Sequence, residues 1–345
     1  MANTLLFCDP FNTYVDTGSK FLLRYWTSSN GSYAVPGNGT FVGGFISKTF
    51  DQGEQSEVAT GFTYTWGGGA GSIAWMGNSN PANGNYNGNF DSPGLNILAD
   101  GRLAIVDNVS SPGFVVAVST VALHIGVPVF IEWLMSVGFT GTGTTGTRDQ
   151  LSVVQLNGTT TGVGLGTTGS PIAWTINVTG TADWDYSQFT VGGTLGGIYV
   201  STGELFGPVQ FTSLFPRANG DVNTWTPLNP PNYSQVNEHS PDDNASYVQA
   251  NASGNEDLYF LDTLTGSGDI KGTMLMLMME NSSQGITSVE PQYKSGGVTM
   301  APSTFNPSSG AYLAFLDPQR HSLFTGVDWT VAEVNGMQVG ALRTS

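Results

Sequence analysis

Residues 95–106 read Leu-Asn-Ile-Leu-Ala-Asp-Gly-Arg-Leu-Ala-Ile-Val, and this stretch decides the predicted fold class. Two short apolar runs lie on either side of Asp100-Gly101. An Asp-Gly pair between two such runs is a strong signal for a β-hairpin with a tight turn. We therefore expect antiparallel strands at residues 95–98 and 103–106, joined at residues 99–101.

The same pattern continues in both directions along the chain. Short runs rich in Val, Ile, Thr, Phe and Tyr alternate with clusters of Gly, Asn, Ser and Pro. A helical period of about 3.6 residues is nearly absent from the first 320 residues. The fold class is therefore predicted to be all-β. Further strands before residue 200 are expected at residues 41–50, 60–66, 115–118, 129–137, 151–156, 172–178 and 189–191.

Composition excludes several classes of protein. The chain has 345 residues, 47 of them Gly, and only 10 % are charged, against about 25 % in an ordinary soluble domain. Ten basic and 26 acidic side chains give a formal net charge of −16. Without a basic cluster, the chain is not expected to bind nucleic acid. Because 39 % of the residues are hydrophobic, the chain has enough apolar surface to build sizeable cores.

The sequence shows neither a disulfide framework nor a membrane segment. Cys8 is the single cysteine, so no internal disulfide is expected. The first residues lack the basic region and the cleavage site of a secretory signal. The most apolar stretch, residues 115–134, contains Pro128 and Glu132, which are costly in hydrocarbon, and it reads better as two strands. No contact with a membrane is expected.

A proline-rich stretch divides the chain. Residues 226–232 read Thr-Pro-Leu-Asn-Pro-Pro-Asn, and stiff segments of this kind often mark domain boundaries. We predict a first domain at residues 1–228, a link at 229–236 and a second domain at 237–345. Thr330 and Glu333 form the pattern of a capping box, which predicts one short helix that ends near Gly336 and is followed by a last strand.

Two groups of motifs stand out in the second domain. The first is Val236-Asn237-Glu238, the acidic stretch at residues 241–248, and Asp257-Leu258-Tyr259. The second is Phe315-Leu316-Asp317-Pro318, Asp328-Trp329-Thr330 and Val334-Asn335-Gly336-Met337-Gln338-Val339-Gly340. Together they resemble a C-terminal domain that recurs in structural proteins of tailed bacteriophages. That family prefers Asp at the position of Asn237 and Ala at the position of Gly336.

Both ends of the first domain carry motifs as well. They are Cys8-Asp9-Pro10-Phe11 at the start, then Gly197-Ile198-Tyr199-Val200, Leu214-Phe215-Pro216-Arg217-Ala218-Asn219-Gly220-Asp221 and Trp225-Thr226. These resemble the concanavalin-A-like β-sandwich that usually precedes the phage-type domain, although Gly197 replaces an acidic residue often found there. The resemblance implies two β-sandwich domains, a jelly roll followed by a smaller sandwich. It also implies a virion protein that contacts other virion proteins and forms a homo-oligomer, with a trimer favoured.

Three aromatic residues are candidates for binding a carbohydrate. Trp66, Trp75 and Tyr86 flank glycine-rich stretches at residues 67–71 and 77–88. Sandwiches of the type resembled often stack sugar rings on aromatic side chains, so these three residues are predicted to form a shallow platform. The alternative is that Trp66 and Trp75 face the core of a hairpin.

Asp183 and Asp185 form the most notable pair of carboxylates. They flank Trp184, so in a strand they would share one face about 7 Å apart. Such a pair suits a solvated strand end or turn, Ca²⁺ as a hard cation, or the acid pair of a glycosidase. No other cofactor is expected. The three histidines are far apart in sequence and no nucleophile motif is present, so we expect no catalytic residues and no enzyme activity.

Residues 274–279 read Met-Leu-Met-Leu-Met-Met, which places apolar side chains on both faces of one strand. A half-exposed strand normally alternates between apolar and polar residues. We therefore predict that Met274, Met276 and Met278 contact a neighbouring subunit or the other domain, since methionine suits an adaptable contact surface. Burial within a single chain is the alternative.

Together these observations predict a structural component of a tailed-phage virion, in the tail, baseplate or fibre, that presents a glycan-recognising surface to the host cell. The first alternative is a capsid decoration or head-fibre protein that stabilises the particle. The second is a hydrolase that depolymerises glycans.

Overall fold

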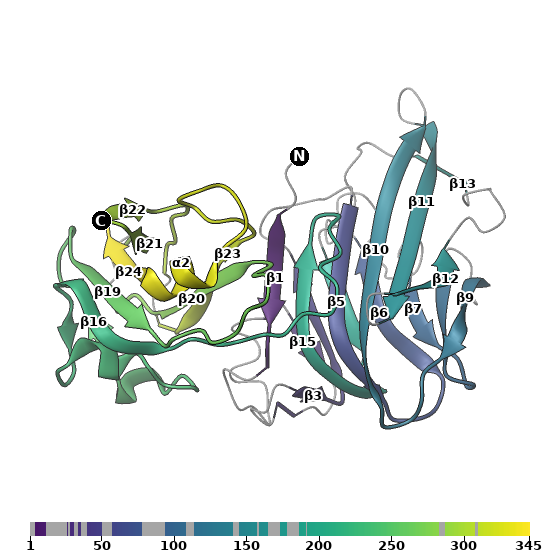
Figure 1. Cartoon of the computed structure of the whole chain (residues 1–345), viewed down its shortest axis with the longest axis horizontal. Helices are drawn as coiled ribbons and strands as arrows, with labels where there is room; N and C mark the ends of the chain where they lie inside the picture. The colour runs from purple at the N-terminus through teal and green to yellow at the C-terminus, as the bar shows by residue number, and fades with distance from the viewer. Residues whose placement is uncertain are drawn as a thin grey trace. The chain divides into compact units, whose positions relative to one another are not determined.

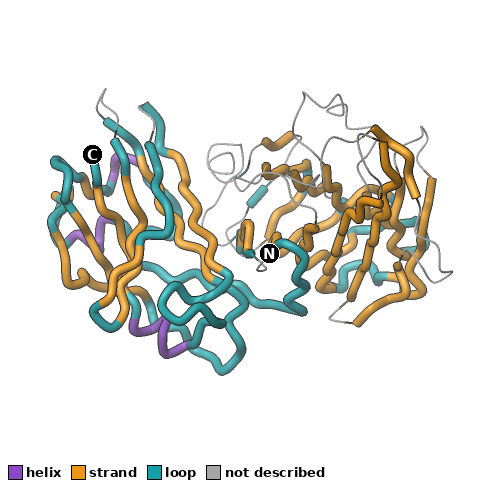
Figure 2. The backbone as a smooth tube through the Cα atoms, turned by 90° about the horizontal axis from the view of Figure 1, so that it is seen from above, coloured by secondary structure: helices purple, strands orange, loops and turns teal. Residues whose placement is uncertain are grey.

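The computed structural model of the chain describes residues 4–11, 26, 28–30, 34–35, 40–49, 57–77, 94–107, 114–140, 145–156, 159–164, 173–177, 186–190, 192–282, 287–307 and 310–345. Strands dominate these residues, and helix is limited to short turns (Figure 2). The prediction of an all-β chain is confirmed. No helix in the described ranges is long and apolar enough to cross a membrane.

The chain divides into two compact units, and the division falls between Gln210 and Phe211. It lies about twenty residues before the proline-rich link predicted at residues 229–236. The reason is that β16 (Pro216–Asn223) pairs with β19 (Glu256–Leu261) and so belongs to the sheet of the second unit. The proline-rich segment is also held there, because Asn232 Nδ2 and the Trp225 amide both donate to the carboxylate of Asp257.

Unit 1 is a β-sandwich of two antiparallel sheets. Its eight-stranded sheet runs in the order β1, β15, β5, β10, β11, β12, with β3 beside β15 and β13 beside β11 (Figure 1). The strands of this sheet are β1 (Leu5–Asp9), β3 (Thr40–Val42), β5 (Glu57–Trp66), β10 (Pro128–Thr140), β11 (Thr145–Leu156), β12 (Thr159–Gly164), β13 (Ala173–Asn177) and β15 (Gly193–Ser201).

The second sheet of unit 1 has seven strands in the order β2, β4, β14, β6, β7, β8, β9. They are β2 (Ser28–Asn30), β4 (Phe45–Thr49), β6 (Gly71–Gly77), β7 (Gly94–Ile97), β8 (Arg102–Asp107), β9 (Phe114–Ala122) and β14 (Tyr186–Thr190). The hairpin predicted at residues 95–106 is confirmed as β7 and β8, and Gly101 has the positive φ (84°) that the turn requires.

The core of unit 1 lies between these sheets. Phe62 of β5 and Phe189 of β14 meet edge to face, with ring centroids 5.4 Å apart, and both are fully buried. Trp26 also packs edge to face against Phe189, and its indole donates a hydrogen bond to the buried carboxylate of Asp9. Aromatic pairs of this geometry add stability beyond the area that they bury. The two sheets are therefore held face to face, and each keeps an outer face.

Unit 2 is built on a five-stranded antiparallel sheet in the order β16, β19, β24, β21, β22. Two two-stranded ladders, β17 with β18 and β20 with β23, complete it. The strands not yet given are β17 (Thr226–Pro227), β18 (Val248–Gln249), β20 (Thr273–Met279), β21 (Val289–Ser295), β22 (Val298–Met300), β23 (Leu313–Gln319) and β24 (Gln338–Arg343). Two short 3₁₀ turns are η2 (Asn232–Gln235) and η3 (Asp243–Ala245).

The short helix predicted near the C-terminus is α2 (Val331–Gly336). The Thr330 hydroxyl accepts a hydrogen bond from the Glu333 amide, as the capping box predicts. The carboxylate of Glu333 does not reach back to Thr330, since it accepts a hydrogen bond from the Ser322 hydroxyl instead. Val334 of this helix belongs to a small core of buried residues, and Leu275 of β20 packs against that core. The buried residues are Tyr293, Trp329, Val334, Met337 and Val339.

Candidate functional site

The outer face of the seven-stranded sheet carries the strongest candidate site. Leu95 and Ile97 of β7 point into the core, so the alternate residues Gly94 and Asn96 lie on the opposite face of the sheet. The ladder places Trp75 of β6 opposite Gly94, and Ser72 opposite Asn96. These four residues, Ser72, Trp75, Gly94 and Asn96, are called the Trp75 face below.

The indole of Trp75 lies directly over Gly94. A Cβ atom at Gly94 would come within 3.3 Å of ring carbons Cε3 and Cζ3, so the missing side chain leaves the space that the ring occupies. Trp75 itself is only half-buried. One side of its ring therefore packs against β7.

Two polar atoms of the Trp75 face lack partners. The hydroxyl of Ser72 and the carbonyl oxygen of Asn96 are shielded from solvent, and neither has a hydrogen-bond partner in the structure as described. A shielded polar atom without a partner costs about 1–3 kcal/mol unless water or a ligand satisfies it. The two residues lie on neighbouring strands at one ladder position.

An ion pair lies at the turn between β7 and β8. Arg102 begins β8, two residues before Ala104, which pairs with Asn96. Its Nε atom lies 2.7 Å from Oδ2 of Asp100, and its amide donates to Oδ1 of the same carboxylate. These two hydrogen bonds, and then the positive charge of Arg102, lower the pKa of Asp100. Arg102 is therefore engaged in an ion pair at the β7–β8 turn.

Trp66 is not a platform residue in this structure. It is 6 % exposed, and its indole N–H donates a 2.8 Å hydrogen bond to the carbonyl of Gly69. A Cβ atom at Gly101 would lie 2.7 Å from its Cζ3 atom, which shows how closely the ring packs against the β7–β8 turn. The expectation that Trp66 offers an exposed ring to a sugar is therefore corrected: its buried ring joins two turns at the end of the sandwich.

The remaining residues predicted for unit 1 lie outside the described part of the chain. These are Tyr86, the third member of the predicted platform, and Asp183 with Asp185, the predicted carboxylate pair. Within the ranges that the structure describes, no three His, Cys, Asp or Glu side chains gather to hold a metal ion.

Met274, Met276 and Met278 share one face of β20, and the ladder with β23 places Pro318, Leu316 and Ala314 opposite them on that face. Leu275 points to the other face, into the core of unit 2. All seven residues of β20 are half-buried. The apolar second face expected from the sequence is present, and its contact with another subunit or domain stays a prediction.

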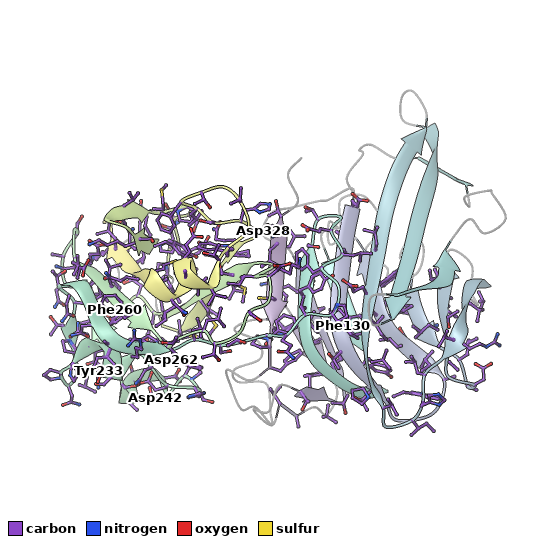
Figure 3. All side chains as sticks on the ribbon, in the orientation of Figure 1. Phe130, Tyr233, Asp242, Phe260, Asp262 and Asp328 are labelled. Carbon is purple, nitrogen blue, oxygen red and sulfur yellow. The ribbon has the colours of Figure 1, made fainter. Side chains whose placement is uncertain are left out.

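A histidine and a carboxylate meet in the loop between β23 and α2. His321 Nδ1 lies 3.1 Å from Oδ1 of Asp328, which is labelled in Figure 3, and Arg320 Nη1 lies 2.9 Å from the same oxygen. The adjacent Ser322 hydroxyl donates to Glu333 and accepts the amides of Phe324 and Thr325. These bonds commit the hydroxyl of Ser322 to shaping a turn, so the group does not have the arrangement of a hydrolytic triad.

A buried carboxylate on the outer face of the eight-stranded sheet was not found from the sequence. Glu132 of β10 is fully buried, and its Oε1 atom accepts hydrogen bonds from the Tyr199 phenol and the Gly207 amide. Phe206 stacks on the ring of Tyr199 with centroids 4.5 Å apart. Phe130, labelled in Figure 3, stacks on it as well. The pair is sealed from solvent and anchors the segment that leaves β15.

Ser72 and Asn96 were likewise missed. Alternation along Leu95, Asn96 and Ile97 indicates that Asn96 turns away from the core, and this signal was available in the sequence. The pairing of Asn96 with Ser72 was not available, because residues 78–93 separate the two strands and their composition fixes no register.

No protein-family model matches the chain, and no curated protein matches its sequence. Solved structures align with it at low similarity. An alginate lyase mutant in complex with an alginate trisaccharide is 13 % identical, with a TM-score of 0.37, over 58 % of this chain and 96 % of the lyase. A Bacillus subtilis protein of unknown function with a galectin-like fold is 10 % identical, with a TM-score of 0.34, over 58 % of this chain and 96 % of that one.

A carbohydrate-binding module from Bacillus subtilis is 11 % identical, with a TM-score of 0.22, over 57 % of this chain and 92 % of the module. Similarity at this level carries no information about function. The β-sandwich assignment rests on the two sheets described above.

Proposed function

We propose that the protein is a non-enzymatic structural component of a tailed-phage virion and that unit 1 recognises a host glycan through the Trp75 face. The observation that carries the glycan part is the half-buried indole of Trp75 beside two polar atoms without partners. A sugar ring combines an apolar face, which stacks on an indole, with hydroxyl groups that satisfy such atoms.

The virion part of the proposal rests on the motifs of the second domain. Polar residues of these motifs make hydrogen bonds within unit 2. Asp317 accepts a 2.7 Å hydrogen bond from the Tyr293 phenol, and the side chain of Asn335 makes two hydrogen bonds to the backbone of Leu264. Gln338 accepts the amide of Asp221. These hydrogen bonds give the motif residues a structural role within unit 2, and the virion role is proposed from the resemblance of the motifs alone.

The glycan part is tested by binding of the whole protein to a glycan array and to host cells. Trp75→Ala should lower affinity at least tenfold, about 1.4 kcal/mol, while the protein stays folded by circular dichroism. Ile125→Ala is the matched control, because Ile125 is 65 % exposed on the β9–β10 turn of the same unit. Equal binding by the Trp75→Ala variant and the parent protein would refute this site.

The virion part is tested by locating the protein on particles. Antibody labelling in electron micrographs should mark the tail, baseplate or fibre. Labelling of the head would favour the capsid decoration alternative, and unlabelled particles would refute a virion role. Release of new reducing ends from host polysaccharide would contradict the non-enzymatic part of the proposal.

A further inference from the structure

We infer that the turns at one end of unit 1 form a contact between two copies of this chain, and this inference does not depend on glycan recognition. Three turns meet at that end. They are the β5–β6 turn at residues 67–70, the β7–β8 turn at residues 98–101 and the β9–β10 turn at residues 123–127.

Hydrogen bonds between the turns hold them in one arrangement. The Gly126 amide donates to the carbonyl of Trp66 at 2.9 Å. The Leu123 amide donates to the carbonyl of Gly101 at 2.8 Å. The buried ring of Trp66 packs beside Gly101, and its indole donates to the carbonyl of Gly69. The surface at this end is therefore preorganised, and a partner that binds it does not have to order a loop.

Apolar side chains are exposed on this arrangement. Val121, Ile125 and Val127 are 50 %, 65 % and 47 % exposed. Ile125 extends over the β5–β6 turn, since its Cδ1 atom lies 3.5 Å from the position that a Cβ atom on Gly68 would take. Single exposed apolar residues are common on protein surfaces, whereas a group of them marks an interaction site. We call this group, together with Asp100 and Arg102, the turn patch.

The charges of the turn patch are complementary to themselves. Residues 66–71, 98–102 and 121–128 contain two charged side chains at neutral pH, Asp100 and Arg102. These side chains are 52 % and 46 % exposed, and Arg102 pairs in the ladder with Ala122, next to Val121. A two-fold axis brings the same surface against itself. Arg102 of one copy can therefore pair with Asp100 of the second copy, and the reverse.

The net charge of the chain argues for a second copy as the occupant. With a formal charge of −16, two copies repel each other at long range, and a contact that sets carboxylates against carboxylates costs energy. At the turn patch a positive group meets each negative group, and the apolar side chains meet one another. The turn patch thus offers this acidic chain a place where a copy of itself fits.

The contact is small, so we expect it to be weak. Its few apolar side chains and its ion pair bury less than the roughly 1,200 Å² of the smaller specific interfaces. We expect a dissociation constant on the order of 100 µM. A two-fold contact closes at two copies, so it joins chains in pairs and does not by itself produce the trimer that the resemblance implies.

Sedimentation equilibrium of the whole protein from about 1 to about 500 µM tests the contact. The average mass of the parent protein should rise towards twice its lower value, and Ile125→Asp should keep the lower value throughout. Val298→Asp is the matched control, because Val298 is 52 % exposed on β22 of unit 2, and this variant should associate like the parent. A constant mass for the parent, association kept by Ile125→Asp, or equal loss in both variants overturns the inference.

Charge reversal tests whether the turn patch meets a copy of itself. Arg102→Glu leaves two negative groups in the turn patch and Asp100→Lys leaves two positive ones, so each variant alone should associate less than the parent. An equimolar mixture of the two should form pairs, because the two surfaces then carry opposite charges. A mixture that fails to associate, while both variants keep the circular dichroism of the parent, overturns the inference. The glycan test uses protein far below these concentrations, so Ile125→Ala remains a valid control there.

Discussion

The phenol hydroxyl of Tyr199 donates a 2.5 Å hydrogen bond to Glu132 and accepts the amide N–H of Phe206 at 3.0 Å. One hydroxyl thus ties a buried carboxylate of β10 to the segment that follows β15. Because Glu132 is fully buried, it cannot exchange these bonds for water without opening the structure.

Removing that hydroxyl should destabilise unit 1. Tyr199→Phe keeps the stacked ring but leaves Glu132 with the Gly207 amide as its described donor. We expect the free energy of unfolding to fall by about 1–3 kcal/mol in urea denaturation. Tyr233→Phe, a change in unit 2, serves as the comparison. An unchanged urea midpoint for Tyr199→Phe would contradict the importance assigned to this bond.

Stability should fall at alkaline pH. Burial raises the pKa of Tyr64 to about 12. Burial, followed by a neighbouring carboxylate, raises the pKa of Tyr199, Tyr259 and Tyr293 above the ordinary value. The folded state therefore keeps protons that the unfolded chain releases from about pH 10 upward. The stability that comes from these buried phenols is therefore fully present below about pH 10 and is lost as the pH rises further.

Two measurements check this. The denaturation midpoint should be lower at pH 11 than at pH 8, and absorbance at 295 nm should show these phenols ionising only as the protein unfolds. Ionisation of all twelve tyrosines near pH 10, with native circular dichroism retained, would be the opposite result.

The proline-rich segment should detach when Asp257 is removed. This buried carboxylate accepts the Trp225 amide at 2.8 Å, Asn232 Nδ2 at 2.6 Å and the Tyr259 phenol at 2.7 Å. In Asp257→Ala we expect rapid proteolysis within residues 225–235 and a large loss of stability, since three donors each lose an acceptor. Asp269→Ala, at an exposed position, is the control. If protease cuts both variants at the same rate, Asp257 does not anchor the segment.

The cap of α2 gives a smaller expected effect. Thr330→Ala removes the acceptor of the Glu333 amide, which should cost about 1 kcal/mol of unfolding free energy. Thr330→Ser keeps the hydroxyl and should restore most of it. The measurement is thermal denaturation of the parent protein and the two variants. Equal midpoints for the alanine and serine variants would contradict the stabilising role of the Thr330 hydroxyl.

Short sequence motifs were sufficient to predict the elements whose conformation depends on neighbouring residues. The hairpin at residues 95–106 follows from Asp100-Gly101, and α2 follows from Thr330, because in both cases the residues that decide the conformation are neighbours in the chain. The domain boundary was displaced because the proline-rich composition is a local signal. The pairing of β16 with β19 joins residues about forty positions apart, and nothing in the intervening sequence specifies it.

The candidate site was predictable to the extent that it depends on one side chain. The aromatic character of Trp75 is visible in the sequence, and its place opposite Gly94 follows only from the register of β6 and β7. Trp66 has the same chemistry and a similar glycine-rich neighbourhood, yet it is buried. Exposure is a property of the packed turns around it, in particular Gly69 and Gly101.

The place where the chain divides has a consequence for making its parts separately. β16 is the outermost strand on one side of the five-stranded sheet, where it covers the backbone amides and carbonyls of β19. A recombinant fragment that starts at the proline-rich link would lack β16 and would present β19 as a bare edge. Such an edge recruits strands from other molecules, so this fragment is expected to aggregate. A fragment that starts at Phe211 retains its own edge strand and is the one to express.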